Sequence, residues 1–200
     1  MPSLLLVVTV CLAEVLTMVG TFTFSALLPS FINEWQLTNT EAGWLSGIML
    51  GGYAISVPAL VGLTDRYDAK LVYLCGAALA AISFAAFALI AEGFWSALIL
   101  RAVSGIALAA TYMPGLRMLV DRINAQISTR GVAIYTASFS LGTAFSFLIS
   151  GEIGGAFGWK IAFIIASVCA ALAVLLVMMT LVPIIPPEPE DKTALLDFRP

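Results

Sequence analysis

The sequence predicts an all-α membrane protein, a bundle of six transmembrane helices. Of its 200 residues, 61% are hydrophobic and 10% are charged, with a mean hydropathy of +1.04, whereas a soluble domain carries about 25% charged residues. The charges cluster and leave six long, mostly uncharged windows. At a rise of 1.5 Å per residue, a helix of about 20 residues crosses a bilayer, so these windows use up most of the chain.

Each window is assigned one helix, over residues 4–28, 41–63, 70–91, 94–116, 131–153 and 160–182. The first helix is expected to be closed by Pro29 and followed by a loop over 30–40. After Val182, prolines alternate with acidic residues, which favours an extended, acidic cytoplasmic linker over 183–200.

Composition excludes several functions. The chain has no histidine, and its three cysteines all lie in apolar windows, so we expect no metal site, no cofactor and no His-based catalysis. An intramembrane enzyme would need a Ser–Lys or carboxylate pair, for which Lys160 is poorly placed, so we expect no enzyme. A net charge of −3 without a basic run also gives no footprint for nucleic acid.

The distribution of lysine and arginine orients the bundle. Alternate loops place seven basic residues on one side and Lys160 alone on the other, which predicts that both termini are cytoplasmic. We expect an integral multi-pass protein of a bacterial plasma (inner) membrane. The seven residues are Arg66, Lys70, Arg117, Arg122, Arg130, Lys192 and Arg199.

Two ionisable residues inside the predicted spans need a chemical reason. Glu14 lies near the bilayer midplane, where a charge costs at least about 2.5–3.5 kcal/mol, and Arg101 is the one intramembrane cation. We expect them to pair, either as a static link between the first and fourth helices or as a proton- or substrate-binding site. Helical spacing adds polar residues to their two faces, as candidates to line a cavity: Thr17, Thr21, Ser25, Ser104 and Tyr112.

Small residues recur every four positions in the second and the fifth predicted helix. Such stripes let helix backbones approach closely, so they predict helix packing. Their matching positions also suggest a 3+3 inverted repeat, an arrangement that transporters use. The residues are Gly43, Gly47 and Gly51 in the second helix, and Gly142 and Ser146 in the fifth.

Three elements resemble the major facilitator superfamily. Residues 62–70 read GLTDRYDAK and resemble the family's Gly-x-Leu-Ala-Asp-Arg-x-Gly-Arg-Lys loop, with Asp68 and Ala69 in place of the second glycine and the following arginine. Residues 101–105 resemble its Arg-x-x-x-Gly element, and 158–163 its Gly-Trp-Arg-x-x-Phe junction. The resemblance covers the whole membrane part.

This resemblance implies the N-terminal half of a secondary active transporter that works by alternating access. The expected partners are a small-molecule substrate, protons, the lipid bilayer, and a missing C-terminal half or a second copy of the chain. Glu14 and Arg101 would carry the coupling or substrate charge. The alternative is a non-transporting scaffold or an inactive fragment. The gating loop would comprise Asp65, Arg66, Lys70, Asp121 and Arg122.

Overall fold

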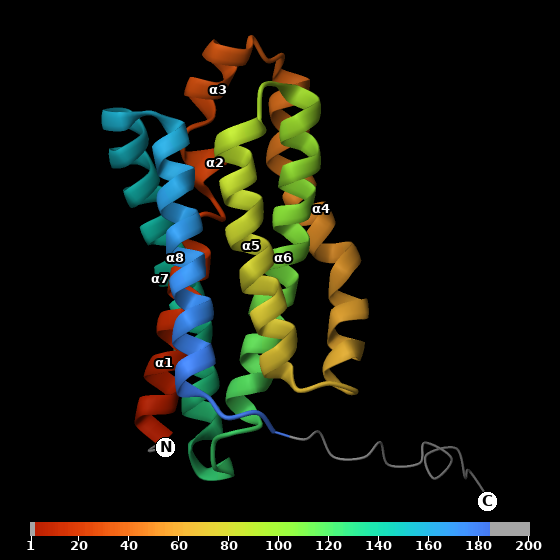
Figure 1. The fold of residues 1–200 in the computed structure, drawn as a ribbon, viewed down its shortest axis with the longest axis vertical. Helices are drawn as coiled ribbons and strands as arrows, with labels where there is room; N and C mark the ends of the chain where they lie inside the picture. Colours follow the sequence, from red (N-terminus) through yellow and green to blue (C-terminus); the bar gives the residue numbers. More distant parts are fainter. Residues whose placement is uncertain (1–2, 185–200) are drawn as a thin grey trace, which may run out of the picture.

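The computed structural model describes residues 3–184, so most of the expected linker, 185–200, lies outside the described residues. The described chain is an all-α bundle (Figure 1), as predicted. Five helices are long and apolar enough to cross a membrane, and α1 is shorter. The helices are α1 (Ser3–Met18), α2 (Thr23–Ala26), α3 (Leu28–Trp35), α4 (Asn39–Thr64), α5 (Ala69–Ile90), α6 (Phe94–Val120), α7 (Ala125–Phe157) and α8 (Trp159–Thr180).

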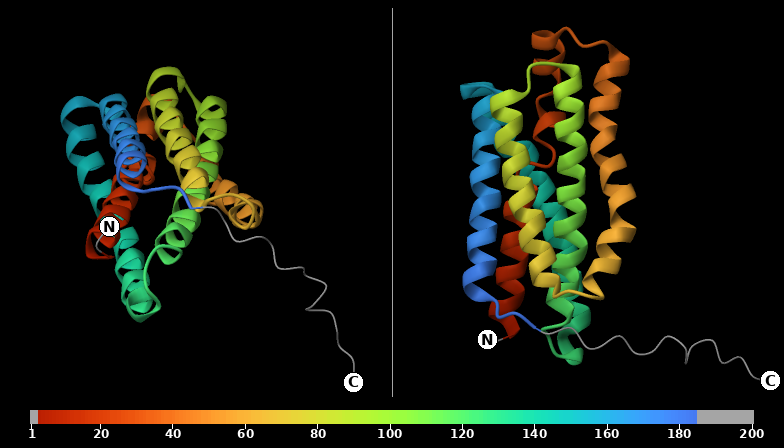
Figure 2. Two further views of the ribbon diagram at one scale, coloured as in Figure 1. Left: turned by 60° about the horizontal axis from the view of Figure 1, so that its bottom comes forward. Right: turned by 45° about the vertical axis from the view of Figure 1, so that its right-hand side comes forward.

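The six spans pack with an internal symmetry. Helix α6 packs against α4 and α5, α1 packs against α7 and α8, and α5 packs against α8, as the two views of Figure 2 show for the last pair. In a 3+3 repeat, α1 corresponds to α6, α4 to α7 and α5 to α8. Under this exchange the α4–α6 contact becomes the α1–α7 contact, the α5–α6 contact becomes the α1–α8 contact, and the α5–α8 contact is unchanged. This is the packing that a 3+3 repeat requires.

The start of α1 and the end of α8 lie at one end of the bundle, here called the terminal end (Figure 1). The opposite, distal end is covered by α3. Phe31 of α3 lies 5.1 Å from Trp159 between ring centroids, and the Phe87 and Phe163 rings stack at 4.2 Å. Glu34 of α3 also accepts a hydrogen bond of 2.7 Å from the Trp159 indole N–H. Aromatic packing therefore fixes α3 on the ends of α5 and α8.

The first span corrects the prediction of one helix over 4–28. Helix α1 ends at Met18, and the chain resumes as α2 and α3. Gly20 lies against the Phe84 ring, with no room for a Cβ atom. Pro29 sits in the first turn of α3, where a proline without an N–H is tolerated, so it starts a helix instead of closing one.

Three of the other spans, α4, α6 and α7, run longer than expected, whereas α5 and α8 lie within two residues of the predicted bounds. Thr38 and Glu41 form a reciprocal capping box that starts α4, with the Glu41 carboxylate 2.9 Å from the Thr38 N–H. Helix α7 begins at Ala125 and ends before Gly158, whose φ of 86° favours glycine. Pro58 and Pro114 lie inside continuous helices.

The glycine stripe of α4 makes no close helix contact within residues 3–184. A Cβ atom on Gly52 would meet the carbonyl of Ala102, and one on Gly105 would meet the carbonyl of Met49, so these glycines allow α4 and α6 to touch. The stripe lies on another face of α4, because the buried residues Leu45 and Met49 face α6. No described atom comes closer than 4.0 Å to a Cβ built on its three glycines, Gly43, Gly47 and Gly51.

Candidate functional site

Glu14 is fully buried in the structure. It lies on α1, with 0% of its surface exposed. Its Oε2 atom accepts a hydrogen bond of 2.9 Å from the hydroxyl of Tyr135 on α7. Its Oε1 atom has no hydrogen-bond partner among the described residues. A carboxylate in such surroundings is costly to ionise, which makes Glu14 a candidate functional group.

Three tyrosines surround Glu14. The Tyr135 hydroxyl also lies 2.9 Å from the carbonyl of Tyr112 on α6, and the two rings stack with centroids 5.8 Å apart. Gly115 makes room for this crossing, because a Cβ atom there would meet the Tyr135 hydroxyl. Tyr73 of α5 is buried beside them, and its hydroxyl has no partner among the described residues. Sequence reasoning missed Tyr135, although a tyrosine hydroxyl in an apolar window needs a partner.

Arg101 lies elsewhere, at the break in the first span. Its Nε atom donates to the carbonyl of Leu45 at 3.2 Å and its Nη1 atom to that of Thr21 at 3.1 Å. The guanidinium also lies 5.0 Å from the centroid of the Phe24 ring. The side chain is 1% exposed, and Nη2 has no partner in the described part of the chain. Arg101 therefore joins α4 and α6 to the residues between α1 and α2.

The expected Glu14–Arg101 pair does not form within residues 3–184. The Tyr135 hydroxyl that binds Glu14 also binds the carbonyl of Tyr112 on α6, so Glu14 lies at the depth of Tyr112. Tyr112 follows Arg101 by eleven residues along the same helix. At 1.5 Å per residue this separates the two levels by about 16 Å. Arg101 lies nearer the distal end, and Glu14 lies nearer the terminal end.

Helix α7 supports the break in the first span. The Ser146 hydroxyl donates to the carbonyl of Val19 at 2.7 Å and accepts the Phe22 N–H at 3.0 Å. Ser150 and Thr23 share a hydrogen bond of 2.7 Å, and Gly142 lies against Met18. A side chain of α7 thus satisfies two backbone groups at the break, the Val19 carbonyl and the Phe22 N–H, as burial in an apolar bundle requires.

The expected polar stripe of the first span is interrupted by the same break. Thr17 is buried and donates to the carbonyl of Glu14 at 2.9 Å, and the Thr21 hydroxyl lies 3.8 Å from the Met18 sulfur. Ser25 and Tyr112 are half-buried. Ser104 is buried and shares a hydrogen bond of 3.2 Å with Ser83.

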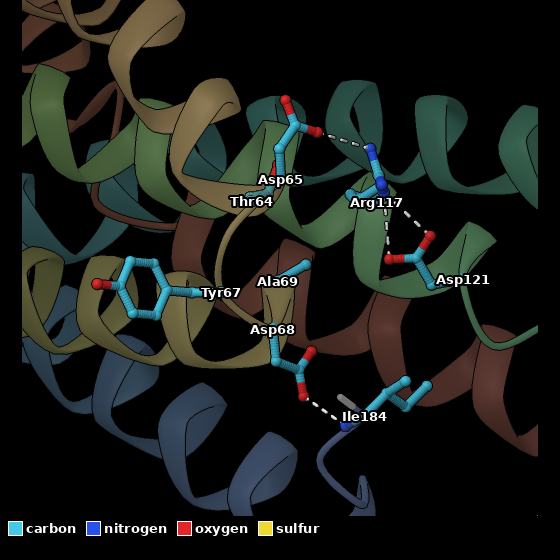
Figure 3. Close-up of a pocket in the computed structure, with 8 residues that line it drawn as sticks. All are labelled: Thr64, Asp65, Tyr67, Asp68, Ala69, Arg117, Asp121 and Ile184. Carbon is cyan, nitrogen blue, oxygen red and sulfur yellow. Dashed lines mark hydrogen bonds and ion pairs between the residues drawn. The ribbon is translucent and has the colours of Figure 1, made fainter. Parts of the chain in front are cut away.

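A second group of charges lies at the terminal end, around a pocket of about 290 Å³ (Figure 3). Arg117 of α6 lies 3.6 Å from Asp65, which follows α4, and 3.0 Å from Asp121. These side chains are 38–60% exposed, so each pair contributes little to stability. Arg66, expected in this group, is exposed and takes no part in the ion pairs of the described residues.

The buried ion pair of this end joins Asp68 to Arg122, with an N–O distance of 3.0 Å and side chains 7% and 8% exposed. Asp68 also caps α5 by accepting the Lys70 N–H at 2.9 Å, and it accepts the Ile184 N–H at 2.7 Å. Burial alone would raise the pKa of Asp68. The two N–H groups and the Arg122 guanidinium outweigh burial and hold this pKa below its ordinary value. Sequence reasoning named Asp68 only as a departure from a family pattern.

Comparison with known proteins decides the family. The sequence profile described as Major Facilitator Superfamily matches residues 10–198. The chain belongs to the major facilitator superfamily. Its members are membrane transporters, and the chain is an integral membrane protein of this family.

Several relatives in this superfamily are similar to the chain over most of its length. The Niacin transporter NiaP of Acinetobacter baylyi is 26% identical over 144 residues, 72% of this chain and 33% of that protein. Protein spinster homolog 1 of Homo sapiens is 21% identical over 152 residues, 76% of this chain and 29% of that protein. The Uncharacterized MFS-type transporter YceJ of Bacillus subtilis is 28% identical over 192 residues, 92% of this chain and 47% of that protein. The chain thus spans about a third to a half of these relatives.

Proposed function

We propose that this chain is the N-terminal half of a proton-coupled secondary transporter, which moves a small molecule by alternating access. Glu14 carries this proposal. Its carboxylate is fully buried, and among residues 3–184 one of its oxygens has no hydrogen-bond partner and the other is held by a tyrosine instead of a cation. An organic substrate has no access to such a group, whereas a proton needs only a passing water molecule.

A charge at Glu14 would alter the packing around it. Its described hydrogen-bond partner is neutral: Tyr135 of α7, whose hydroxyl also lies 2.9 Å from the Tyr112 carbonyl of α6, with the Tyr73 ring of α5 close by. Ionised, Glu14 holds Tyr135 by a charge-assisted hydrogen bond, which is about twice as strong as a neutral one. Protonation at the free Oε1 weakens this link between α1 and α7. Proton binding would thereby favour a different arrangement of these two helices.

Arg101 takes a different role in the proposal. It holds two carbonyls at the break and is too buried to reach a substrate in this conformation. We assign it to the joint of the first span, where a discontinuous helix can bend. The half-buried residues Ser25 and Tyr112 are left as candidates to contact the substrate.

We also propose that the terminal end faces the cytoplasm of a bacterial cell. Arg66, Lys70, Arg117 and Arg122 all lie at this end, next to the ends of α4, α6 and α8. Lys160 lies at the distal end, beside Trp159 at the start of α8. Basic residues favour the cytoplasmic side of a membrane.

The test is uptake into proteoliposomes that hold either this chain or the chain extended by its downstream reading frame. Niacin is the first substrate to try, because one relative is named for it, followed by other small organic acids and bases. An imposed pH gradient should accelerate uptake. Glu14→Gln should abolish the acceleration, while Glu152→Gln, which changes an exposed glutamate on α7, should retain it.

The outcomes distinguish half of a transporter, a self-assembling transporter, and a scaffold or inactive fragment. Uptake by the extended chain alone means that this chain is half of a transporter, and uptake by the chain alone means that two copies assemble. A gradient effect that survives Glu14→Gln would overturn the assignment of the proton site. Binding of partner proteins without uptake of any substrate would favour a scaffold or an inactive fragment.

A further inference from the structure

The backbone that leaves α8 is held by side chains from distant parts of the chain. From Leu181 the chain is extended and crosses the terminal end of the bundle (Figure 1). Lys70 Nζ donates to the Leu181 carbonyl, and Arg122 Nη2 donates to the Val182 carbonyl at 3.1 Å. Asp68 accepts the Ile184 N–H at 2.7 Å, as Figure 3 shows. Side chains thus bind three of the four residues 181–184 through the backbone.

The groups that hold this segment are themselves fixed. Arg122 Nη2 contacts both oxygens of Asp68, at 3.0 and 3.1 Å, and Arg122 Nη1 donates to the Met118 carbonyl at 3.2 Å. Asp68 is anchored by its cap on α5. Because the partners are held before the segment arrives, little conformational entropy is lost when it binds.

The arrangement is distinct from the neighbouring Asp65–Arg117 pair. That pair is exposed and has no hydrogen bond to residues 181–184. Asp68 stands where the family pattern has a glycine, and a glycine has no side chain to hold either Arg122 or Ile184. The contact therefore belongs to this chain and does not follow from its family motif.

We propose that Asp68, Lys70 and Arg122 form a latch that binds the backbone of Leu181–Ile184 and sets the direction in which the chain leaves α8. The latch joins the α4–α5 connection to the ends of α6 and α8, and so ties the first three spans to the last three. A displacement of the chain after α8 would therefore move the connection between α4 and α5, which contains Asp68. The latch does not depend on proton coupling.

Amide hydrogen exchange of the chain in lipid nanodiscs tests the latch, read in peptides that cover residues 178–186. Asp68→Asn removes the charge but leaves an oxygen that still caps α5, since asparagine is a good N-cap residue. Exchange at the Ile184 amide should become about tenfold to hundredfold faster, as expected when a hydrogen bond to a charged group is lost. Arg122→Gln should accelerate exchange in the same segment.

Asp65→Asn is the matched control, because it neutralises an exposed aspartate in the same connection and should leave this exchange unchanged. Circular dichroism of each variant checks that the helices persist. Unchanged exchange in both Asp68→Asn and Arg122→Gln would show that packing of the buried Leu181 holds the segment, and would overturn the latch. Equal acceleration by Asp65→Asn would also overturn it, since the effect would then reflect loop charge alone.

Discussion

Replacing Gly115 by alanine tests the geometry around Glu14. A Cβ atom at this position would meet the Tyr135 hydroxyl, and it would come within 3.2 Å of the ring carbon that bears this hydroxyl and 3.3 Å of the Tyr73 ring. The Tyr135 hydroxyl must therefore leave its present position, which is set by its hydrogen bond to Glu14. The substitution should weaken the hydrogen bond between Tyr135 of α7 and Glu14 of α1 without changing either residue.

The expected effect follows from three terms. Alanine gains about 1 kcal/mol over glycine inside a helix. Overpacking costs about 1–3 kcal/mol, and loss of a hydrogen bond inside a membrane bundle costs about 0.6–1.7 kcal/mol. Gly115→Ala should thus lower the free energy of unfolding by about 0.6–3.7 kcal/mol. Gly151→Ala, on α7 with no atom within 4 Å of the added Cβ, should be neutral or slightly stabilising.

Equilibrium unfolding in mixed micelles with increasing dodecyl sulfate measures these values. The decisive comparison is a double-mutant cycle with Tyr135→Phe, which removes the oxygen that the new methyl group would meet. In that background Gly115→Ala should cost at least about 1 kcal/mol less, because the two residues are in contact. An equal cost in both backgrounds would refute the placement of the Tyr135 hydroxyl beside Gly115.

Three further predictions concern stability. The pKa of Asp68 is lowered in the folded state, so its contribution is present above its unfolded value of about 3.9 and disappears as the pH falls through the folded value. Unfolding curves across pH should therefore show Asp68→Asn less stable than the parent near pH 7, with the difference shrinking as the pH falls through the lowered pKa of the folded state. Ser146→Ala should cost about 1–2 kcal/mol, because two backbone groups at the break lose their partner. Ser140→Ala, at an exposed position on the same helix, should leave the unfolding midpoint unchanged. Gly105→Ala should prevent α4 from packing on α6, whereas Gly47→Ala should be tolerated; thermal unfolding by circular dichroism compares the two.

The bundle was predictable because hydropathy acts over whole spans. A window without charges must leave water, whatever the detailed packing within it. The break in the first span was not predictable from this signal, since residues 19–22 are as apolar as their neighbours. It depends on Ser146 and Arg101, which lie far along the sequence and supply the hydrogen bonds that the local backbone loses.

The site was only partly predictable for a similar reason. Distance along a helix gives the depth of a residue in the membrane, and this identified Glu14 as an unusual group. It does not give the neighbour at that depth, so the cation Arg101 was expected where the neutral Tyr135 lies. The role of Asp68 could not be predicted because its carboxylate binds the backbone N–H of Ile184, more than a hundred residues later. Nearly every residue has such an N–H group, so the sequence does not indicate which one a side chain will bind.

The break in the first span also constrains the order of folding during synthesis. The backbone at Val19–Phe22 leaves the ribosome well before Arg101 and Ser146, the residues that will satisfy it. In hydrocarbon, an unsatisfied N–H or carbonyl group costs several kcal/mol. The nascent first span must therefore stay a continuous helix, or remain near water, until α6 and α7 have been inserted. Its final shape is a late event in the assembly of the bundle, although its residues are made before those of α6 and α7.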